Sequence, residues 1–418
     1  MDARGAWRRR WGRGTRHHPR AVLTCLAMLV SAPATADAAT VQLGAPQDGE
    51  TCARYGLCNF PLEFNAAAGE ANVVSITPTT TEGLVVRDDG APLQAGSGCE
   101  RIDEHSAECG LGRPIQGGTV ELGDRDDHAV SPGVLVSGGD GNDFLEAPGG
   151  AAKGGAGNDS ISCELAPGPP PAGPTGCNID GESGADRVAG GPASDRIVGG
   201  AGDNDVLEGG EGLDVIDYST QQRAVRVDLS RATQRSTTNG GAESIRGFEF
   251  AYGGEGDDFL TSGSRIDSSF DASSRPFVPE MRGGKGDDRI VLRSRIFASA
   301  GAGDDVVSGG SGSGGTGDDR LTGSRGRDGL SGGPGRDVLR GSGGGDELQG
   351  GSGADQLDGG GGEDVLTGGP GADRLVSVES RPRRDRVDCG AGRGDRAVAD
   401  RRDRIRRCER VKRQRRRT

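Results

Sequence analysis

Aromatic residues make up only 3% of this 418-residue chain, and hydrophobic residues as a group make up 32%. Both shares are too low for a thick globular core. The chain also has only four histidines and no HExxH motif, which argues against a zinc protease. Two kinds of structure remain: a disordered chain, or a repeat fold whose thin core is filled by regularly spaced apolar residues.

Positive charge is scarce in the middle of the chain. The net charge is −13, yet residues 1–38 carry +5 and residues 381–418 carry +11, which leaves −29 for residues 39–380. A segment this acidic repels nucleic acid, so nucleic acid is not an expected partner. It either stays expanded or recruits cations.

Long hydrophobic runs are also missing, apart from one near the N-terminus. An Arg-rich stretch ends at Arg20, apolar residues run from Ala21 to Val30, and the small-residue pattern Ala36-Asp37-Ala38 follows. These three parts predict a signal peptide over residues 1–38 and therefore a secreted, extracellular protein, with a cytosolic protein as the alternative. The apolar run is too short for a membrane anchor, and no other stretch predicts a transmembrane segment.

Cysteine is present in a number that favours disulfides. Eight of the nine cysteines remain after the predicted cleavage, and an even number in an exported chain predicts disulfide bonds. Proximity alone suggests the pairs Cys52–Cys58, Cys99–Cys109, Cys163–Cys177 and Cys389–Cys408. Zinc is the alternative, but there is no CxxC motif, and the mature chain has only His105 and His128.

The dominant feature of the sequence is a nine-residue repeat. Seven uninterrupted copies run from Gly314 to Val376: GGTGDDRLT, GSRGRDGLS, GGPGRDVLR, GSGGGDELQ, GGSGADQLD, GGGGEDVLT and GGPGADRLV. All seven have Gly at positions one and four, Asp at position six and Leu at position eight. The unit recurs upstream from Gly138, Gly154, Gly209, Gly253 and Gly283, and degenerate copies begin at Gly181, Gly190, Gly199 and Ala300. A disordered Gly-rich linker has no reason to keep Leu at every ninth residue.

The positions within the unit predict its geometry. The first six residues predict a tight turn, because glycine adopts backbone angles that other residues avoid. The last three predict a short strand in which only the eighth side chain points inward. Two units then make one coil, and stacked coils line Leu and Ile into a thin core. The turns stack into two columns, one along each edge.

Each column would bring Asp carboxylates and turn carbonyl oxygens of successive coils together. Such an all-oxygen, negatively charged environment suits calcium, which takes about 6–8 oxygen ligands in flexible geometry. Transition metals would instead require histidine or cysteine.

Over roughly residues 138–376 the pattern resembles the RTX, or haemolysin-type, calcium-binding repeat family. The resemblance implies an all-β fold, a right-handed parallel β-roll (β-solenoid) that holds multiple Ca²⁺ ions between its coils. It also implies that the position-six aspartates are the metal ligands: Asp143, Asp159, Asp186, Asp195, Asp205, Asp214, Asp258, Asp288, Asp305, Asp319, Asp328, Asp337, Asp346, Asp355, Asp364 and Asp373. The chain departs from the family in its N-terminal signal, its basic C-terminus and its lack of a toxin, protease or lipase domain, which argues against a toxin.

Other segments flank or interrupt the predicted β-roll. We expect a β-rich N-terminal cap over 39–137 (or a separate small sandwich), an insertion at 163–177, longer coils at 218–252, and a disulfide-bonded C-terminal cap with a basic tail over 377–418. Residues 401–417 of that tail contain eleven Lys and Arg residues. Such a block is usually a solvated, disordered end; the alternative is a tether to an anionic cell-envelope polymer or lipid surface.

The sequence offers no convincing catalytic group. Gly329–Gly333 matches the nucleophile-elbow motif, but it lies inside the repeat, where glycine is frequent. His105 and His128 are isolated and expected to be solvated. The sequence thus predicts a non-enzymatic extracellular structural or interaction module. The alternatives are a calcium-dependent adhesin that binds a cell-surface polymer, and an enzyme within residues 39–137.

Overall fold

The computed structural model describes residues 38–44, 60–79, 83–110, 115–164, 176–201, 204–230, 234–237, 242–263, 280–379 and 383–414. Within these ranges all regular structure is β-strand, arranged in two sheets, A and B. The predicted all-β class is therefore confirmed. The described residues contain no apolar helix long enough to cross a membrane. Residues 1–37 of the predicted signal peptide, the pair Cys52 and Cys58, and residues 165–175 of the predicted insertion lie outside these ranges.

Sheet A has 18 strands, and each neighbouring pair is parallel except β1 with β2. Its strands, in spatial order, are β5 (Leu93–Ala95), β1 (Ala39–Leu43), β2 (Phe60–Asn65), β8 (Ile115–Glu121), β10 (Leu135–Asp140), β12 (Ala151–Ala156), β14 (Asn178–Ser183), β16 (Arg196–Val198), β18 (Val215–Asp217), β22 (Phe250–Tyr252), β24 (Glu280–Lys285), β26 (Phe297–Ala302), β28 (Ser311–Thr316), β30 (Gly329–Pro334), β32 (Glu347–Ser352), β34 (Val365–Gly371), β36 (Arg386–Gly392) and β38 (Arg404–Arg406).

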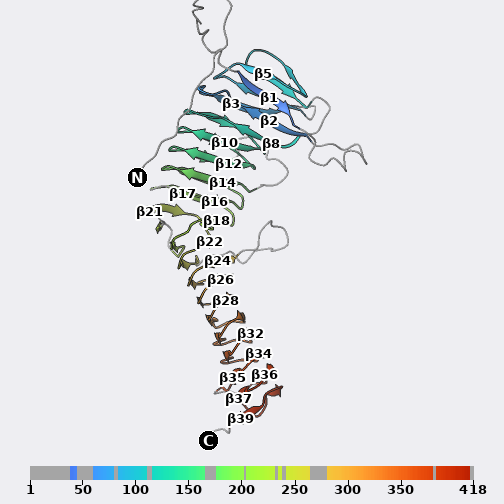
Figure 1. The fold of residues 1–418 in the computed structure, drawn as a ribbon, viewed down its shortest axis with the longest axis vertical. Coiled ribbons are helices and arrows are strands. Elements are labelled where there is room, and N and C mark those ends of the chain that lie inside the picture. The colour runs from blue at the N-terminus through green and yellow to red at the C-terminus, as the bar shows by residue number, and fades with distance from the viewer. Residues whose placement is uncertain are drawn as a thin grey trace, which may run out of the picture. The chain divides into compact units, whose positions relative to one another are not determined.

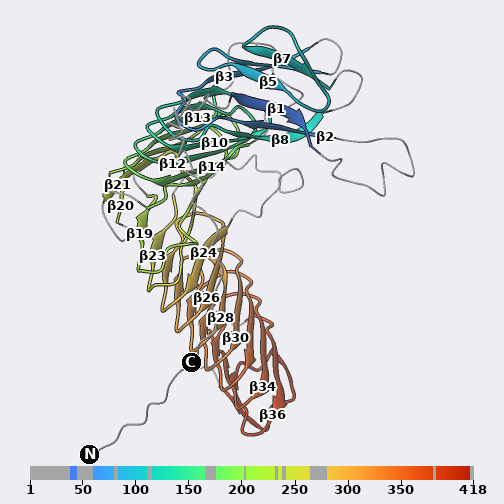
Figure 2. The same cartoon turned by 45° about the horizontal axis from the view of Figure 1, so that its top comes forward.

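Sheet B takes the remaining strands, which alternate with those of sheet A along the chain from β8 to β18 and from β22 onward. In spatial order these are β6 (Cys99–Arg101), β7 (Ser106–Cys109), β4 (Leu84–Asp88), β3 (Val73–Pro78), β9 (His128–Val130), β11 (Phe144–Glu146), β13 (Ser160–Ser162), β15 (Arg187–Gly191), β17 (Val206–Gly210), β21 (Ala242–Arg246), β20 (Gln234–Thr237), β19 (Arg226–Asp228), β23 (Phe259–Thr261), β25 (Arg289–Val291), β27 (Val306–Ser308), β29 (Arg320–Thr322), β31 (Val338–Arg340), β33 (Gln356–Asp358), β35 (Arg374–Ser377), β37 (Arg396–Ala399) and β39 (Arg410–Arg413). Figure 1 shows sheet A strands from β10 to β36 following one another along the stack, and Figure 2 shows β24 to β36 as neighbouring rungs.

The register shows that two nonapeptides form one coil. In sheet A, Leu330 pairs with Leu348 and Leu348 with Leu366. In sheet B, Leu339 pairs with Leu357, also 18 residues apart. The position-eight leucines of the seven uninterrupted repeats are at most 2% exposed. Alternate repeats therefore supply the two sheets, and their leucines fill the thin core between them, which confirms the predicted parallel β-roll.

Glycine is required where successive coils approach most closely. The φ angle of Gly353 is +144°, and a Cβ on this residue would lie 1.5 Å from the carbonyl oxygen of Gly335 in the preceding coil. Gly333 has a φ of +118°, and its Cβ would lie 2.0 Å from the oxygen of Gly315. A side chain at either position would separate the coils or strain the backbone.

The N-terminal strands continue both sheets rather than forming a separate sandwich. Strand β2 pairs with β8 in sheet A, and β3 pairs with β9 in sheet B, both in parallel. A single hydrophobic cluster extends from Ala39 to Ala397. The cap differs from the repeats in its antiparallel pairs, which join β1 to β2, β3 to β4, β4 to β7 and β7 to β6.

Three of the four predicted disulfides lie in the described residues: Cys99–Cys109, Cys163–Cys177 and Cys389–Cys408. The last one links β36 to the segment before β39 and so fastens the final coil, as predicted for the C-terminal cap. Residues 404–406 and 410–413 of the basic tail are strands of the stack, which corrects the expectation of a disordered end for these residues. Residues 415–418 lie outside the described ranges.

Candidate metal centre

The turns stack into two columns of carboxylates, one at each edge of the coil. In column B, named for the sheet whose strands follow the turns, the backbone amide of Asp319 donates to Oδ1 of Asp337 at 2.9 Å, and the amide of Asp337 donates to Oδ1 of Asp355 at 2.9 Å. In column A, the amide of Asp346 donates in the same way to Oδ1 of Asp364 at 2.9 Å. Each carboxylate is therefore held against the backbone of the preceding coil.

All sixteen position-six aspartates identified in the sequence lie in these columns, and each is at most 6% exposed. Column B contains Asp143, Asp159, Asp186, Asp205, Asp258, Asp288, Asp305, Asp319, Asp337, Asp355 and Asp373. Column A contains Asp195, Asp214, Asp328, Asp346 and Asp364.

The columns extend beyond the residues singled out in the sequence. Asp127 precedes Asp143, and Asp395 follows Asp373 in column B. Asp385 and then Asp403 follow Asp364 in column A. In all four turns the fourth position of the unit is arginine instead of glycine, so the strict repeat pattern does not find these aspartates.

Glutamate replaces aspartate at two rungs. Oε2 of Glu249 accepts from the amide of Asp214 at 2.9 Å, and Oε2 of Glu409 accepts from the amide of Asp395 at 2.8 Å. Column A also lacks a carboxylate before β26 and β28, where Ile296 and Gly310 occupy the position. No sequence signal marks these replacements, because their segments depart from the nonapeptide length.

Most of the column aspartates have one oxygen atom that no group of the described protein satisfies. Oδ1 accepts the amide hydrogen bond, whereas Oδ2 is inaccessible to solvent and lacks a hydrogen-bond partner in Asp143, Asp159, Asp186, Asp195, Asp288, Asp305, Asp319, Asp337, Asp346, Asp355, Asp364 and Asp373, and likewise in Asp127 and Asp395. A buried carboxylate oxygen without a partner destabilises the folded state. A cation bound to these oxygens would remove that penalty.

The first glycine of each repeat keeps space open beside this oxygen. A Cβ on Gly332 would lie 2.2 Å from Oδ2 of Asp337 and 2.5 Å from the carbonyl oxygen of Gly350 in the next coil. Gly154 has the same surroundings, with Oδ2 of Asp159 at 2.3 Å and the oxygen of Gly181 at 2.6 Å. A side chain would thus fill a cradle lined by a carboxylate oxygen and a backbone oxygen. This donor set fits a hard divalent cation such as calcium.

Burial raises the pKa of these carboxyl groups well above its ordinary value. The pKa of Asp288 rises to about 8, that of Asp305 to about 7 and that of Asp319 to about 6, because the turns exclude water. The amide bond on Oδ1 lowers each of these pKa values, whereas nearby carboxylates raise them further. Stacked carboxylates without a cation thus resist ionisation.

In two column aspartates, Oδ2 already accepts hydrogen bonds from donors in the same turn. Oδ2 of Asp328 accepts from the amide and the hydroxyl of Ser324, at 2.6 and 2.8 Å. Oδ2 of Asp258 accepts from the amide of Gly254 at 2.7 Å. These two rungs need a cation less than their neighbours do.

The described residues outside the columns do not assemble the alternatives raised by the sequence. Ser331 lies within β30, in register with Ser313 and Gln349, rather than on a strand-to-helix turn. Cys163 and Cys177 lie close to Asp195, but their sulfur atoms are joined in a disulfide, which leaves no thiolate for zinc.

The two histidines are not simply solvated, contrary to the expectation from sequence. Nδ1 of His105 lies 2.9 Å from the carbonyl oxygen of Asp88 and 3.0 Å from that of Ala91. The ring of His128 packs edge-on against Phe144, with centroids 5.0 Å apart. Both contacts are structural.

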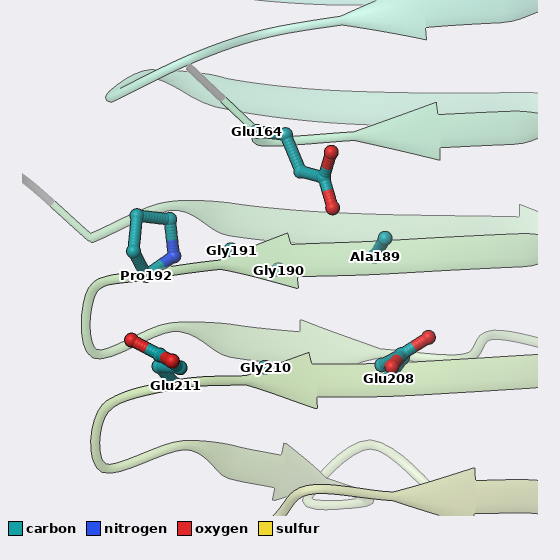
Figure 3. A pocket seen from close by; sticks show the side chains of 8 residues that line it. All are labelled: Glu164, Ala189, Gly190, Gly191, Pro192, Glu208, Gly210 and Glu211. Carbon is teal, nitrogen blue, oxygen red and sulfur yellow. The ribbon is translucent and has the colours of Figure 1, made fainter.

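A pocket of about 540 Å³ lies along β15 and β17 and is lined on one side by Glu164. Figure 3 shows Glu164, the segment from Ala189 to Pro192, and Glu208 with Glu211 on three successive rungs. Glu208 is already paired with Arg246, and the lining contains no nucleophile or histidine. The pocket therefore supplies no catalytic constellation.

A protein-family model described as the RTX calcium-binding nonapeptide repeat matches residues 180–216, 202–220, 239–267, 297–314, 313–339 and 340–375. No curated protein matches the chain. The matched segments contain turns of both columns, including the uninterrupted run of repeats. These segments are RTX calcium-binding nonapeptide repeats, and they lie in the parallel β-roll of the described residues, an arrangement that fits a calcium-binding β-roll protein.

Proposed function

We propose that the protein is an exported, non-enzymatic β-roll that folds outside the cell when calcium ions fill its two columns of turns. The observation that carries this proposal is the series of buried aspartates whose Oδ2 atoms have no partner. Successive coils add carboxylates to column B, and many also add one to column A, whereas the thin core offers little hydrophobic stabilisation to offset this charge. A cation between successive coils removes that penalty.

The proposed ligands are the position-six aspartates of both columns, with Asp127, Asp385 and Asp395 as additions. Oδ2 of one coil and a glycine carbonyl oxygen of the next, as around Gly332, would bind the same ion. Several ions would therefore line each column, and Asp258 and Asp328 would contribute least because their turns already satisfy them.

Export is supported by the three-part pattern over residues 1–38. Extracellular calcium modules bind with dissociation constants of about 0.1–1 mM. Sites this weak would stay empty in the cytosol and fill outside, so the chain would cross the membrane unfolded and fold afterwards.

A second candidate function, adhesion to an anionic cell-surface polymer, is favoured by the C-terminal coils. Residues 383–414 contain thirteen Lys and Arg residues, all exposed, and six Asp and Glu residues. Four of the six acidic residues, Asp385, Asp395, Asp400 and Asp403, are buried. The surface of these coils is therefore almost purely cationic, and a polyanion would complement it.

The calcium proposal is tested by circular dichroism of the chain from residue 39 to its end. We expect weak β signal in EDTA and a cooperative gain as calcium is added in the range of about 0.1–1 mM. Magnesium at equal concentration is the control, since its stricter octahedral geometry suits these sites poorly. A spectrum unchanged between EDTA and excess calcium would falsify the proposal.

A further inference from the structure

At the start of column A, a cysteine occupies the position that holds a carboxylate in the repeats. The amide of Cys177 donates to Oδ1 of Asp195 at 2.7 Å, just as the amide of Asp195 donates to Oδ1 of Asp214 at 2.8 Å. The amide of Arg196 in turn donates to the carbonyl oxygen of Cys177 at 2.9 Å. Cys177 therefore occupies the column position of the coil that precedes Asp195, and its side chain offers sulfur instead of oxygen.

Three potential metal ligands lie together at this position. The Sγ atoms of Cys163 and Cys177 and a carboxylate oxygen of Asp195 all lie within 4.8 Å of one another. The carbonyl oxygen of Ala147 lies 3.6 Å from the first sulfur atom and 3.4 Å from the second. Tetrahedral zinc, with bonds of about 2.3 Å to sulfur and about 2.0–2.2 Å to oxygen, keeps its ligands about 3.5–3.8 Å apart. The three donors are thus within reach of one ion.

The carboxylate of this group is buried and incompletely satisfied. Asp195 is 0% exposed, and its Oδ2 is inaccessible to solvent and has no hydrogen-bond partner. Cys163 and Cys177 are each 4% exposed, so the sulfur atoms share these dry surroundings. A buried carboxylate without a cation destabilises the folded state, and a metal ion bound beside it would remove that penalty.

The oxidation state of the two cysteines determines whether their sulfur atoms can bind a metal. Cys163 and Cys177 are joined in the structure, and only the thiolate form of cysteine is a metal ligand. A dithiol can open the bond, because it passes two electrons and two protons to the cysteines and itself becomes a disulfide. A metal ion that binds the two sulfur atoms then releases the two thiol protons.

Sulfur donors select a different ion from the one that suits the rest of the columns. The aspartates of the columns and the backbone offer only oxygen, which suits calcium, whereas thiolates favour thiophilic ions such as Zn²⁺. Two thiolates and the carboxylate of Asp195 supply three charged ligands. The carbonyl oxygen of Ala147 or a water molecule can supply the fourth, which gives the four-coordinate arrangement that zinc prefers.

A pocket beside the site offers ions a route to it. The pocket of about 540 Å³ is lined by Glu164, Gly190 and Gly191, among others (Figure 3). A Cβ on Gly191 would lie 3.2 Å from the carbonyl oxygen of Cys163, and a Cβ on Gly190 would lie 2.5 Å from Oδ2 of Asp195. The pocket therefore lies next to two of the three ligands, and the exposed carboxylate of Glu164 attracts cations into it.

We propose that Cys163, Cys177 and Asp195 bind a zinc ion when the two cysteines are thiols, in a site that does not exist while the disulfide is intact. The ion links Cys163 to the first position of column A in the reduced protein, as the disulfide does in the oxidised protein. The inference goes beyond the calcium-filled columns, because it uses sulfur ligands and does not require calcium at any other position.

Zinc binding to the reduced chain from residue 39 tests the site. The chain is reduced with a water-soluble phosphine, which brings no competing sulfur ligand, and bound zinc is counted by native mass spectrometry. We expect Cys163→Ser to weaken the binding of one zinc ion at least about tenfold. The matched control is Cys389→Ser, which removes a cysteine of another described disulfide and should keep that ion. Equal binding by Cys163→Ser and the unsubstituted protein would overturn the site.

A carboxylate variant distinguishes the folded site from a pair of cysteines in an unfolded chain. Asp195→Asn should also weaken zinc binding at least about tenfold. Its control is Asp180→Asn, which removes a charge from β14 outside the group and should bind zinc as the unsubstituted protein does. Equal zinc affinities for these two variants would show that Asp195 is not a ligand and overturn the site as proposed.

Alkylation of the unsubstituted reduced protein gives a readout that needs no variant to fold. Bound zinc should slow the reaction of Cys163 and Cys177 with iodoacetamide and leave that of Cys99 and Cys109 unchanged, as mapped by mass spectrometry of the digested protein. Unprotected Cys163 and Cys177 would overturn the site. The calcium columns would stand in that case, because calcium-dependent folding is measured separately on the oxidised protein.

Discussion

The uninterrupted repeats and the C-terminal coils share an interior but differ outside. Leu366 of the repeats pairs with Val387, and Leu375 pairs with Ala397, so the core continues with smaller residues. The columns continue too, because Asp364 bonds to Asp385 across the boundary. The inward and turn positions therefore determine the structure of the coil, whereas residues at outward positions can change without altering that structure.

The outward positions of the C-terminal coils hold charges that oppose folding. Arg374, Arg396 and Arg410 lie directly in register on β35, β37 and β39, and Arg386 is in register with Arg404 in sheet A. Like charges opposite each other on neighbouring strands are destabilising. The Cys389–Cys408 disulfide offsets part of this repulsion by closing the last coil.

Acidification should have the largest effect, because it removes the charge of the columns and leaves the arginines charged. The pKa values of Asp288, Asp305 and Asp346 in the folded, calcium-free roll are about 7–8, far above the ordinary value of 3.8. The calcium-free fold therefore binds protons more tightly than the unfolded chain does. The resulting stability is full below about pH 4 and is lost as pH rises through 6 to 8.

We therefore expect the chain in EDTA to show more β signal by circular dichroism at pH 5 than at pH 8. At pH 8 the chain should fold only when calcium is added, and the calcium concentration at half-maximal folding can be measured. At pH 5 the chain should fold with little added calcium. Equal β signal in EDTA at both pH values would contradict the idea that column charge keeps the calcium-free chain unfolded.

A methyl group between coils should have the next largest effect. Gly353→Ala places a Cβ against the oxygen of Gly335 at a positive φ, so we expect a loss of about 3 kcal/mol or more in the free energy of unfolding of the calcium-loaded protein. Gly329→Ala, in the same run, is the control, since a Cβ there meets nothing within 4 Å and should change stability by less than about 0.5 kcal/mol. Thermal unfolding in calcium measures both; similar losses would show that coil spacing does not depend on glycine.

The sequence predicted the repeats well because one residue type recurs at each structural position. The nine-residue period identifies the turn, the inward Leu and the column Asp in a single pattern, and the structure keeps all of them between Gly314 and Val376. In the cap no period exists, so the pairing of β1 with both β2 and β5 could not be read from it.

The same reason explains which column members were missed. Asp385 lies in a segment that contains no glycine, and Glu249 replaces an aspartate within the longer coils at 218–252. Neither residue lies at a fixed distance from a glycine-rich turn. The spacing of residues in the sequence identifies the column members only where every coil has the same number of residues.

Neutralising the outer face of the C-terminal coils should change binding without changing the fold. We expect the quadruple substitution of Arg404, Arg406, Arg410 and Lys412 by Gln to elute from a heparin column at clearly lower salt than the unsubstituted protein, because each cation near a polyanion adds to a salt-dependent attraction. Calcium-dependent folding, followed by circular dichroism, should be unchanged, since these side chains point away from the columns.

The control for this variant carries the same loss of charge in the repeats. Substituting Arg289, Arg320, Arg336 and Arg340 by Gln removes four exposed cations from an acidic region, where Arg336 is already paired with Asp318. We expect its heparin elution to stay close to that of the unsubstituted protein. Equal shifts for both variants would mean that net charge, rather than the C-terminal surface, determines binding.

The smallest effect should come from Ser324, which occupies the second position of its repeat in place of glycine. Its hydroxyl donates to Oδ2 of Asp328 at 2.8 Å, beside the amide of the same residue at 2.6 Å. Ser324→Gly removes the first of these two donors and should tighten calcium binding at this rung about two- to fivefold, the equivalent of one ordinary hydrogen bond. Ser342 has the same position in a later repeat but a φ of +79°, and Ser342→Gly should instead relieve strain and stabilise the protein by up to about 1 kcal/mol with or without calcium. Calcium titration and thermal unfolding of both variants separate the two effects. If Ser324→Gly leaves the calcium concentration at half-maximal binding unchanged, the hydroxyl does not compete with calcium, and Asp328 binds calcium as the neighbouring column aspartates do.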